Sequence, residues 1–373
     1  MNNKNLIIFS YDYPPLDGGI ARLCNEIACG ALDYYEKVTV LTTKKEGQKK
    51  SYSTADNVTI VEVRSKRICC EWDCYKYLCS IKNKQDYDVV CGLWHPEASI
   101  ALFSGFKNVY TLAHGTELLA GTSKFKRNFW LPIYAKFVLN KTKSVITNSH
   151  YTERLAKKIN PKANTIAIPL AVNHLFFKPE AAKKENNDII SLCSVSRVQQ
   201  FKGHDFIIKT IAALPSDLRA KIRYNIAGRG SYLPELKNLA KQLNVENIVS
   251  FKGFVADSDL PAFYSQNDVF ILCTRESTDS TNVEGFGLVF LEAQSCGIPA
   301  IGTNTGGIPD AVHNENGGWL IEQDNKEELS ALLTKLIESP LLIKEMGVKA
   351  RERVESCSTW QIYCEKLFDV IKQ

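Results

Sequence analysis

Short runs of almost wholly apolar residues alternate along the chain with longer segments of helical period. Runs such as NLIIFS at residues 5–10 and DVFILC at 268–273 hold few polar residues, which is typical of parallel strands covered on both faces. The segments YTERLAKKI at 151–159 and LPELKNLAKQL at 233–243 have the spacing of amphipathic helices. The alternation predicts an α/β architecture built twice. The other predicted strands span residues 37–43, 58–63, 87–94, 108–114, 144–149 and 165–170 in the first half, and 188–195, 222–228, 248–253 and 298–303 in the second.

A polar, charged segment at residues 171–188 separates the two sets of strands. A chain of 373 residues also exceeds what one hydrophobic core usually holds. We therefore predict two Rossmann-like, doubly wound domains, spanning residues 1–172 and 173–357, that face a central cleft. Ligands of such sheets bind at the carboxyl ends of the strands.

The composition is that of an ordinary globular enzyme, with 45% apolar and 23% charged residues. The apolar run near the start is too short for the core of a signal peptide, and no window approaches the roughly 18 apolar residues of a membrane span. We expect a cytoplasmic protein. The twelve cysteines form no C-x-x-C pair, so we expect reduced thiols rather than a zinc site or a disulfide framework.

Charge is unevenly distributed along the chain. Residues 1–170 hold 24 Lys and Arg against 15 Asp and Glu, whereas the remainder holds 22 against 26. In the basic half, KFKRNFWLPIYAKFVLNKTK at 124–143 interleaves cations with aromatic residues, which suits peripheral contact with an anionic membrane. Nucleic acid is a rival partner, but no nucleic-acid-binding motif accompanies the segment, and we expect none to bind. Helical spacing predicts that Phe129, Ile133 and Phe137 face the core, while the membrane or acceptor side would carry Lys124, Lys126, Arg127, Trp130, Lys141 and Lys143.

The most informative stretch is EGFGLVFLEAQ at residues 284–294. Two glycines precede a predicted helix, so backbone N–H groups and the helix dipole favour a phosphate there. Glu284 and Glu292 lie at most about 12 Å apart along the axis, too far for a close acid pair. We interpret them as ligands for hydroxyl groups on either side of the phosphate, although Glu292 alone would equally fit a solvated helix residue.

Three other sites follow predicted strands. Arg197 and Lys202 in SVSRVQQFKGHD suit a diphosphate, with simple surface solvation as the alternative. The pair Gly18-Gly19 in YDYPPLDGGIARL permits close approach of a ligand to the backbone. His114 in TLAHGTE lies at a strand end beside a glycine and an acid, where a functional role competes with a structural one.

Taken in order, these motifs resemble those of the family-4 retaining glycosyltransferases of the GT-B fold, the glycosyl transferases group 1. The resemblance covers nearly the whole chain. It is carried by YPPLDGGIARL, AHGTE, TNSHYTERLAKKI, SVSRVQQFKGHD, YNIAGRGSYLPELKNLA, VSFKGFVADSDLPAFYSQNDVFILCT and EGFGLVFLEAQSCGIPAIGTNTGGIPD. Two departures are Pro309-Asp310 in place of Pro-Glu, and a loop before Glu284 that is longer than the usual Pro-Ser pair.

The resemblance implies a nucleotide-sugar donor held mostly by the second domain, without a metal or other cofactor. Arg197 and Lys202 would neutralise the diphosphate, Glu284 would hold the donor sugar, Glu292 the ribose, and Phe254 would lie near the base. His114 would contact the donor sugar from the first domain. The donor-binding set implied by the family is Gly18, Gly19, Phe254, Gly285, Phe286, Gly287, Leu288 and Glu292. The segment at 358–373 would pack back on the first domain, and closure of the domains would be coupled to donor binding.

We therefore expect a retaining enzyme that moves a hexosyl unit from a UDP- or GDP-sugar to a hydroxyl of a lipid-linked or polysaccharide acceptor, in cell-surface polysaccharide synthesis such as O-antigen or capsule. Because no carboxylate is placed for double displacement, we expect same-face attack assisted by the leaving phosphate. Two alternatives stay open: a sugar-nucleotide enzyme with a small soluble acceptor, or an epimerase, of the same fold, and a non-catalytic subunit that binds nucleotide sugars.

Overall fold

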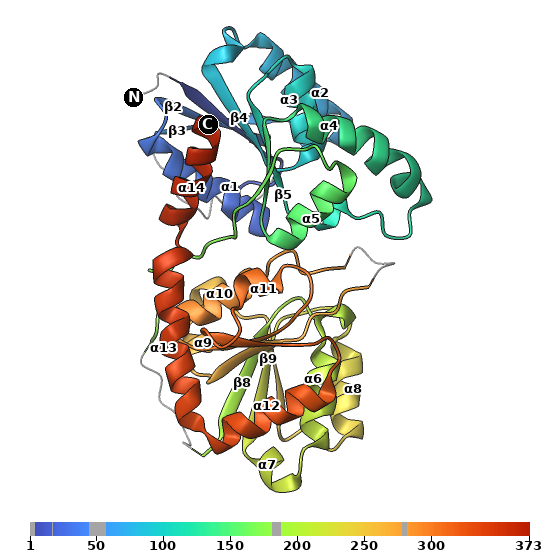
Figure 1. Ribbon diagram of the computed structural model, residues 1–373, viewed down its shortest axis with the longest axis vertical. Helices are drawn as coiled ribbons and strands as arrows, with labels where there is room; N and C mark the ends of the chain where they lie inside the picture. The colour runs from blue at the N-terminus through green and yellow to red at the C-terminus, as the bar shows by residue number, and fades with distance from the viewer. Residues whose placement is uncertain (1–3, 17, 45–56, 181–187, 278–281) are drawn as a thin grey trace. The chain divides into compact units, whose positions relative to one another are not determined.

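The computed structural model describes residues 4–16, 18–44, 57–180, 188–277 and 282–373, which form two compact units (Figure 1). Unit 1 comprises Met1–Pro169 with Trp360–Gln373, and unit 2 comprises Leu170–Thr359. The chain passes between the units within three residues of the boundaries expected from the sequence. Each unit contains one parallel sheet with helices, and the predicted α/β, Rossmann-like architecture is confirmed.

Unit 1 is built on a seven-stranded sheet in the order β3-β2-β1-β4-β5-β6-β7. Every pairing is parallel, and the strand order reverses between β1 and β4, which is the point where doubly wound sheets bind ligands. The strands β5 and β6 are buried throughout, and β1, β2 and β4 are buried after their first residue, as their apolar sequences require. The strands are β1 (Asn5–Phe9), β2 (Lys37–Thr43), β3 (Val58–Val63), β4 (Tyr87–Cys91), β5 (Val109–Ala113), β6 (Ser144–Thr147) and β7 (Thr165–Ala167).

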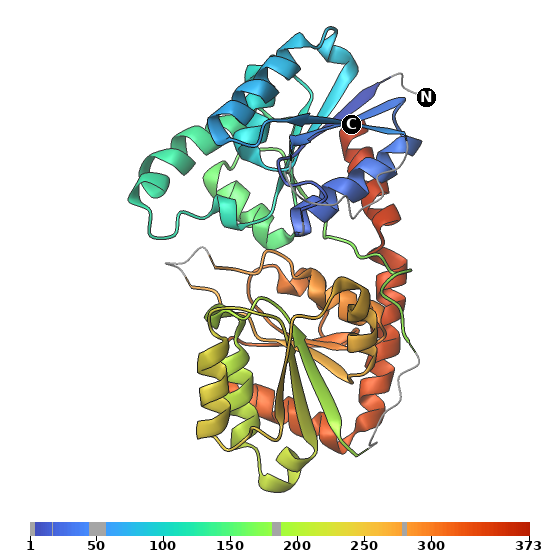
Figure 2. The same cartoon turned by 180° about the vertical axis from the view of Figure 1, so that it is seen from behind.

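Helices cover both faces of this sheet. One core joins Leu78, Ala101, Leu139 and Ala156 to the sheet, so the helices α2 to α5 share a face. On the other side α14 lies beside α1 (Figures 1 and 2), and the Tyr110 hydroxyl donates to the Ile371 carbonyl at 3.0 Å. The helices are α1 (Gly19–Gly30), α2 (Arg67–Ser80), α3 (Ser99–Phe103), α4 (Lys136–Lys141), α5 (His150–Ile159) and α14 (Trp360–Lys372), with a kinked segment at Trp94–Ala98 and a π-type segment at Lys126–Ala135.

Unit 2 is built on a six-stranded parallel sheet in the order β10-β9-β8-β11-β12-β13. The last strand, GWLI, was not predicted because it is short and begins with glycine. The strands are β8 (Ile190–Val195), β9 (Ile222–Ala227), β10 (Val249–Gly253), β11 (Val269–Leu272), β12 (Ala300–Thr303) and β13 (Gly318–Ile321). The helices are α6 (His204–Ala213), α7 (Ser216–Ala220), α8 (Leu233–Gln242), α9 (Leu260–Ser265), α10 (Leu288–Ser295), α11 (Ile308–Ala311), α12 (Lys326–Glu338) and α13 (Pro340–Cys357).

The predicted core positions of the basic–aromatic segment are wrong. Phe129, Ile133 and Phe137 are 57%, 62% and 46% exposed, and the helix buries Leu131 and Ala135 instead. Pro132 and the wider i→i+5 turns of the π-type segment shift the period away from 3.6, so spacing alone assigned the wrong face. The helix therefore presents a second apolar stripe to solvent.

Unit 1 also buries a carboxyl group at the carboxyl edge of its sheet. Glu97 is 1% exposed, its Oε1 accepts the Tyr11 N–H at 3.3 Å, and its Oε2 has no hydrogen-bond partner among the described residues. Burial raises the pKa of Glu97 to about 8, and the negative charge of Asp12 adds to the rise. The side chain is therefore protonated in the folded protein at neutral pH.

This protonation predicts an alkaline loss of stability that Glu97→Gln removes. Between the ordinary carboxyl pKa and pH 8 only the folded state holds the proton, so the free energy of unfolding falls by about 1.4 kcal/mol per pH unit as pH rises. From pH 5.5 to 7.5 the wild type should lose about 2 kcal/mol more than Glu97→Gln in urea denaturation. Glu62→Gln, at an exposed position of β3, should behave like the wild type. Equal losses in the wild type and Glu97→Gln would contradict a neutral Glu97.

Candidate functional site

Four predicted site residues of unit 2 lie in loops at one edge of its sheet. Arg197 and Lys202 follow β8, Phe254 follows β10, and Glu284 ends the long loop after β11. Because all strands of the sheet are parallel, these loops emerge at the same, carboxyl edge. Parallel strand order thus gathers residues that are far apart in the sequence.

Lys202 and Glu284 form an ion pair at this edge. The Lys202 Nζ lies 2.5 Å from the Glu284 Oε2, and the two side chains are 11% and 17% exposed. Lys202 ends a 3₁₀ turn, Gln200–Lys202, and is followed by Gly203 with a φ of 76°. A Cβ at Gly203 would lie 1.9 Å from the Cys273 carbonyl oxygen, so only glycine lets this turn press against the end of β11.

The helix α10 begins at Leu288, four residues after Glu284. Gly287 has a φ of 93°, and a Cβ there would meet the Phe290 ring at 2.6 Å and Glu284 Cγ at 3.3 Å. Among the described residues no side chain caps this N-terminus, where Gly285, Phe286 and Leu288 flank the cap. The Gly307 N–H holds the Glu284 carbonyl at 2.8 Å. The first N–H groups of α10 are therefore directed to a position beside Glu284 that suits an anion.

Glu292 is buried rather than solvated. It lies one turn inside α10, is 5% exposed, and its Oε2 accepts a hydrogen bond from the Tyr264 hydroxyl at 2.9 Å. Burial, followed by the charge of Glu292, raises the pKa of Tyr264, so the phenol stays a donor. Tyr264 was not predicted, and its pairing with Glu292 is a contact between α9 and α10 that sequence spacing does not reveal.

An exposed aromatic ring and two cations complete this edge. Phe254 is 62% exposed, and the Arg229 guanidinium lies 5.2 Å from the centre of its ring. Arg197 is exposed in the loop after β8. Arg229 was missed, although its place between two glycines directly after β9 was a usable signal. A polar pocket of about 540 Å³ opens nearby, lined among others by Gln199, Gln200, Phe201, Asp205, Ser231 and Arg275.

Beneath the Lys202 turn runs a buried polar chain that the sequence did not predict. The His204 Nε2 lies 2.9 Å from Ser196 Oγ, and its Nδ1 lies 2.8 Å from the Tyr224 hydroxyl, which in turn lies 2.7 Å from Ser194 Oγ. Burial lowers the pKa of His204 to about 4, and the charge of Lys202 acts in the same direction. A neutral imidazole therefore supports the loops on both sides of Lys202.

In unit 1, His114 is oriented by three hydrogen bonds. Its backbone N–H donates to Glu117 Oε1 at 2.7 Å, and its backbone carbonyl accepts from the Asn148 side chain at 3.2 Å. Its ring Nε2 lies 2.9 Å from the Gly92 carbonyl. A carbonyl can only accept, so Nε2 carries a proton, and the neutral tautomer that fits this contact has its lone pair on Nδ1. His114 therefore has a fixed ring whose Nδ1 can accept a hydrogen bond.

The other predicted residues of unit 1 lie in two places. Gly18 and Gly19 are exposed at the start of α1, where Gly18 has a φ of 154° that side-chain-bearing residues rarely adopt. Lys124, Lys126 and Arg127 are exposed, and Trp130 is partly exposed. The expected cleft and the joint use of His114 with unit 2 concern both units together and stay predictions.

Among the described residues, no group of three or more His, Cys, Asp or Glu side chains could hold a metal ion. No helix within these residues is long and apolar enough to cross a bilayer. The expectation that the reaction needs no metal stays a prediction.

A comparison with known protein families matches most of unit 2. The profile of the family described as "Glycosyl transferases group 1" matches residues 176–353, which include Arg197, Lys202, Glu284 and Glu292. The chain carries a glycosyl transferases group 1 domain. The resemblance seen in the sequence is confirmed, and the protein is a glycosyltransferase of the GT-B fold.

Curated relatives of this glycosyltransferase match over most of the chain. A Mycobacterium tuberculosis protein named GDP-mannose-dependent alpha-(1-6)-phosphatidylinositol monomannoside mannosyltransferase is 29% identical over 276 residues, 70% of this chain and 71% of the relative. A Corynebacterium glutamicum protein named GDP-mannose-dependent monoacylated alpha-(1-6)-phosphatidylinositol monomannoside mannosyltransferase is 26% identical and covers 99% of this chain and 98% of its own. A putative colanic acid biosynthesis glycosyltransferase of Escherichia coli is 25% identical over 71% of this chain and 64% of its own length.

Solved structures agree on the fold. Sucrose-phosphate synthase from Thermosynechococcus elongatus has a TM-score of 0.77 at 18% identity, covering 100% of this chain and 99% of its own. HepE from Anabaena, solved with UDP-glucose, has a TM-score of 0.73 at 17% identity, covering 98% of this chain and 99% of its own. At these identities the likeness establishes the architecture alone.

The neutral His204 predicts an acid-sensitive fold. Between the ordinary histidine pKa and about pH 4 only the unfolded state binds the proton, so the free energy of unfolding falls as pH drops through this window. From pH 7 to pH 5 the wild type should lose about 2 kcal/mol more than His204→Gln, measured by urea denaturation. His150→Gln, at an exposed position of α5, serves as the control and should retain the full acid loss. A wild-type acid loss no larger than that of His204→Gln would show that His204 is not held neutral.

Proposed function

We propose that the protein is a retaining, metal-independent glycosyltransferase that transfers a hexosyl unit from a nucleoside-diphosphate sugar to a hydroxyl of a lipid-linked or polysaccharide acceptor. The observation that carries the proposal is the Lys202–Glu284 pair beside the glycine-bounded N-terminus of α10. A cation, a carboxylate and uncapped helix N–H groups at one place suit the junction of a sugar with a diphosphate.

The donor is held by groups of unit 2. Lys202 turns from Glu284 to the diphosphate, joined by Arg197, while the N–H groups of Phe286, Gly287 and Leu288 hold phosphate and sugar oxygens. Glu284 then accepts hydrogen bonds from the sugar hydroxyls. Glu292, fixed by the Tyr264 hydroxyl, receives the ribose, and the exposed Phe254 ring offers a face for the base.

The reaction itself uses charge stabilisation rather than a protein nucleophile. The bond between the anomeric carbon and the phosphate oxygen breaks, and the acceptor oxygen bonds the same face of that carbon. The acceptor proton passes to an oxygen of the departing diphosphate. Lys202, Arg197 and the α10 N–H groups stabilise the negative charge that develops on the leaving group. From unit 1, His114 offers its Nδ1 to a hydroxyl of the donor sugar, and Gly18 and Gly19 leave room near the phosphates and acceptor.

Donor and acceptor classes are proposed from the relatives. The names of two relatives support a GDP-hexose donor and a lipid-linked acceptor, and HepE in complex with UDP-glucose supports a UDP-hexose. The colanic acid relative supports a role in bacterial cell-surface polysaccharide synthesis. A transferase with a small soluble acceptor is the second candidate, because the proposed donor site in unit 2 would serve either kind of acceptor.

An exposed apolar surface in unit 1 supports the choice of a lipid-linked acceptor. Side chains exposed by 46% to 63% form what we call the apolar ridge. Phe103 stacks against Phe137 with ring centres 6.5 Å apart, and Phe125 stacks against Phe129 at 6.3 Å, so the ridge spans α3 and the helix through α4. Exposed cations flank the ridge, so we propose that it enters an anionic leaflet at the inner face of the cell membrane. The ridge comprises Phe103, Phe125, Phe129, Ile133 and Phe137, and its cations are Lys124, Lys126, Arg127, Lys136, Lys141 and Lys143.

A thermal-shift screen of UDP-, GDP- and dTDP-sugars tests the donor site. At a concentration about 100 times Kd, the true donor should raise Tm by roughly 5 °C through mass action. Lys202→Met removes the charged contact to the diphosphate and should weaken binding about tenfold or more. Lys237→Met, at an exposed position of α8, should bind like the wild type.

The same donor then distinguishes the alternatives. Transfer to a membrane-lipid extract with the anomeric configuration retained, read by NMR, supports the full proposal. Transfer only to small soluble sugars favours the second candidate. Binding without transfer or hydrolysis would identify a non-catalytic subunit, and the absence of any nucleotide-sugar binding would overturn the proposed function.

Vesicle sedimentation tests the apolar ridge. Phe129→Ser with Ile133→Ser should lower binding to phosphatidylglycerol-rich vesicles about tenfold or more at both low and high salt, because inserted apolar area is lost. Lys126→Gln with Arg127→Gln should weaken binding mainly at low salt, where each cation contributes about 1 kcal/mol. Leu341→Ser, at a position 78% exposed on α13, is the matched control. Wild-type binding by the Phe129/Ile133 variant would rule out insertion of the ridge.

A further inference from the structure

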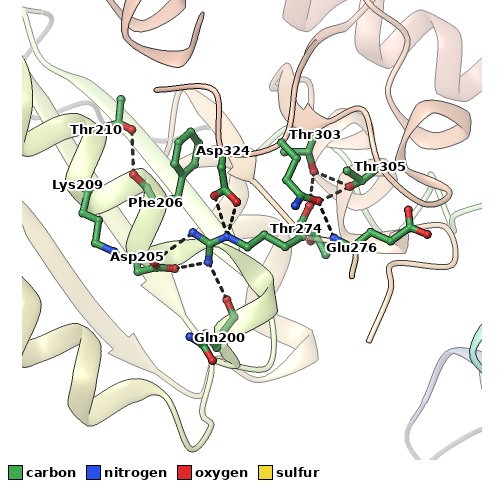
Figure 3. A network of polar contacts seen from close by, with 12 residues as sticks. Gln200, Asp205, Phe206, Lys209, Thr210, Thr274, Glu276, Thr303, Thr305 and Asp324 are labelled. Carbon is green, nitrogen blue, oxygen red and sulfur yellow. Dashed lines mark hydrogen bonds and ion pairs between the residues drawn. The ribbon is translucent and has the colours of Figure 1, made fainter. Parts of the chain in front are cut away.

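Arg275 lies at the exit of β11, in the loop that departs from the usual Pro-Ser pair. Its Nη1 and Nη2 contact the two carboxylate oxygens of Asp205 at 2.7 and 3.2 Å, and its Nε contacts those of Asp324 at 2.7 and 3.0 Å. Figure 3 shows Asp205 and Asp324 converging on one centre, together with Gln200. One guanidinium thus joins the first turn of α6 to the loop that follows β13.

The same residue contacts the turn that carries Lys202. The Arg275 N–H donates to the Phe201 carbonyl at 2.6 Å, and its Nη1 donates to the Gln200 carbonyl at 3.3 Å. These two carbonyls belong to the residues that directly precede Lys202. Arg275 therefore holds the Gln200–Lys202 turn through both its main chain and its side chain.

The residues beside Arg275 are fastened in turn to the loop that supports Glu284. The Thr274 carbonyl accepts from Thr303 Oγ1 at 2.6 Å and from Thr305 Oγ1 at 2.9 Å (Figure 3). The Gly306 N–H donates to Glu276 Oε2 at 3.3 Å, and the next N–H, of Gly307, holds the Glu284 carbonyl. The exit of β11 is thus connected on one side to Lys202 and on the other to Glu284.

The charges of this cluster are balanced so that the connection persists at neutral pH. Burial alone would raise the pKa of Asp205, but the hydrogen bonds and charges of Arg275 and Lys209 outweigh it and lower that pKa. The Asp205 side chain is 7% exposed, whereas that of Lys209 is 54% exposed. Arg275 is therefore the partly buried cation of the cluster, and Lys209 neutralises Asp205 from the solvent side.

We propose that Arg275 is a positioning residue that fixes the Lys202 ammonium for the diphosphate of the donor, an inference that rests on the proposed function. The planar guanidinium is required because it can serve two carboxylates and a carbonyl at once in fixed directions. The ammonium of a lysine cannot span the same partners. Without the guanidinium the Gln200–Lys202 turn keeps the backbone bond to the Phe201 carbonyl but loses the side-chain bond to the Gln200 carbonyl and the bridge to Asp205 and Asp324, so the position of Lys202 is less well defined.

The test compares Arg275→Lys and Arg275→Met with the control Lys209→Met, which removes the solvent-side partner of the same Asp205. The first readout is amide hydrogen exchange of the unliganded protein in a peptide covering residues 199–203. The second is the ratio of affinities for a nucleoside diphosphate and the matching nucleoside, using UDP with uridine and GDP with guanosine. Tm is measured for each variant, and Arg275→Lys, which keeps the charge, stands in if Arg275→Met does not fold.

Both Arg275 variants should speed exchange in the 199–203 peptide and lower the affinity for the diphosphate about tenfold, with nucleoside affinity unchanged. Lys209→Met should match the wild type in both readouts. Unchanged exchange in the Arg275 variants would overturn the positioning role. Faster exchange with an unchanged affinity ratio would overturn its link to the diphosphate.

The hydrogen-exchange readout is independent of ligand. If the wild type binds neither nucleoside diphosphate, the proposed donor site fails and the link to the diphosphate fails with it. Exchange in the 199–203 peptide still decides whether Arg275 orders the turn. The two failures are therefore distinguishable.

Discussion

The close crossing of two backbones at Gly203 and Cys273 is the constraint on which the candidate donor site depends. The Lys202 turn lies against the end of β11 with no room for a side chain, so Lys202 reaches Glu284 although 82 residues separate them. This proximity is then stabilised from several directions by short polar contacts rather than by apolar packing. The backbone of a site assembled in this way is already in place before any ligand arrives, which lowers the entropic cost of binding.

Both units place one ionisable group in its neutral form near the carboxyl edge of the sheet. Glu97 in unit 1 keeps a proton because burial penalises its charge, and His204 in unit 2 loses one for the same reason. Their effects on the free energy of unfolding have opposite signs: the Glu97 contribution is lost as pH rises toward 8, and the His204 contribution is lost as pH falls toward 4. A neutral support beneath the Lys202 turn also avoids a second fixed cation beside the ammonium.

The apolar runs predicted almost the whole sheet of each unit because buried parallel strands need continuous hydrophobic sequence. The strand β13 (GWLI) was not predicted, because a run of four residues that begins with glycine gives little hydrophobic pattern to recognise. The glycines and charged residues of the candidate donor site could be singled out because strand ends and helix starts are visible in the sequence. Tyr264, His204 and Arg275 were missed because their roles depend on partners brought close only by folding. Phe129 and Ile133 were assigned to the wrong face because a π-type segment does not keep the period of an ordinary helix.

The placement of α14 has a consequence for synthesis on the ribosome. Its Phe368 ring lies 4.6 Å from that of Tyr34, and a side chain on Gly30 would collide with Cys364, so α14 is an integral part of unit 1. Unit 2 is contiguous in the chain and emerges before α14 does. Unit 1 therefore stays incomplete until all of unit 2 has been translated. Until then, the side of its sheet that α14 later covers is exposed.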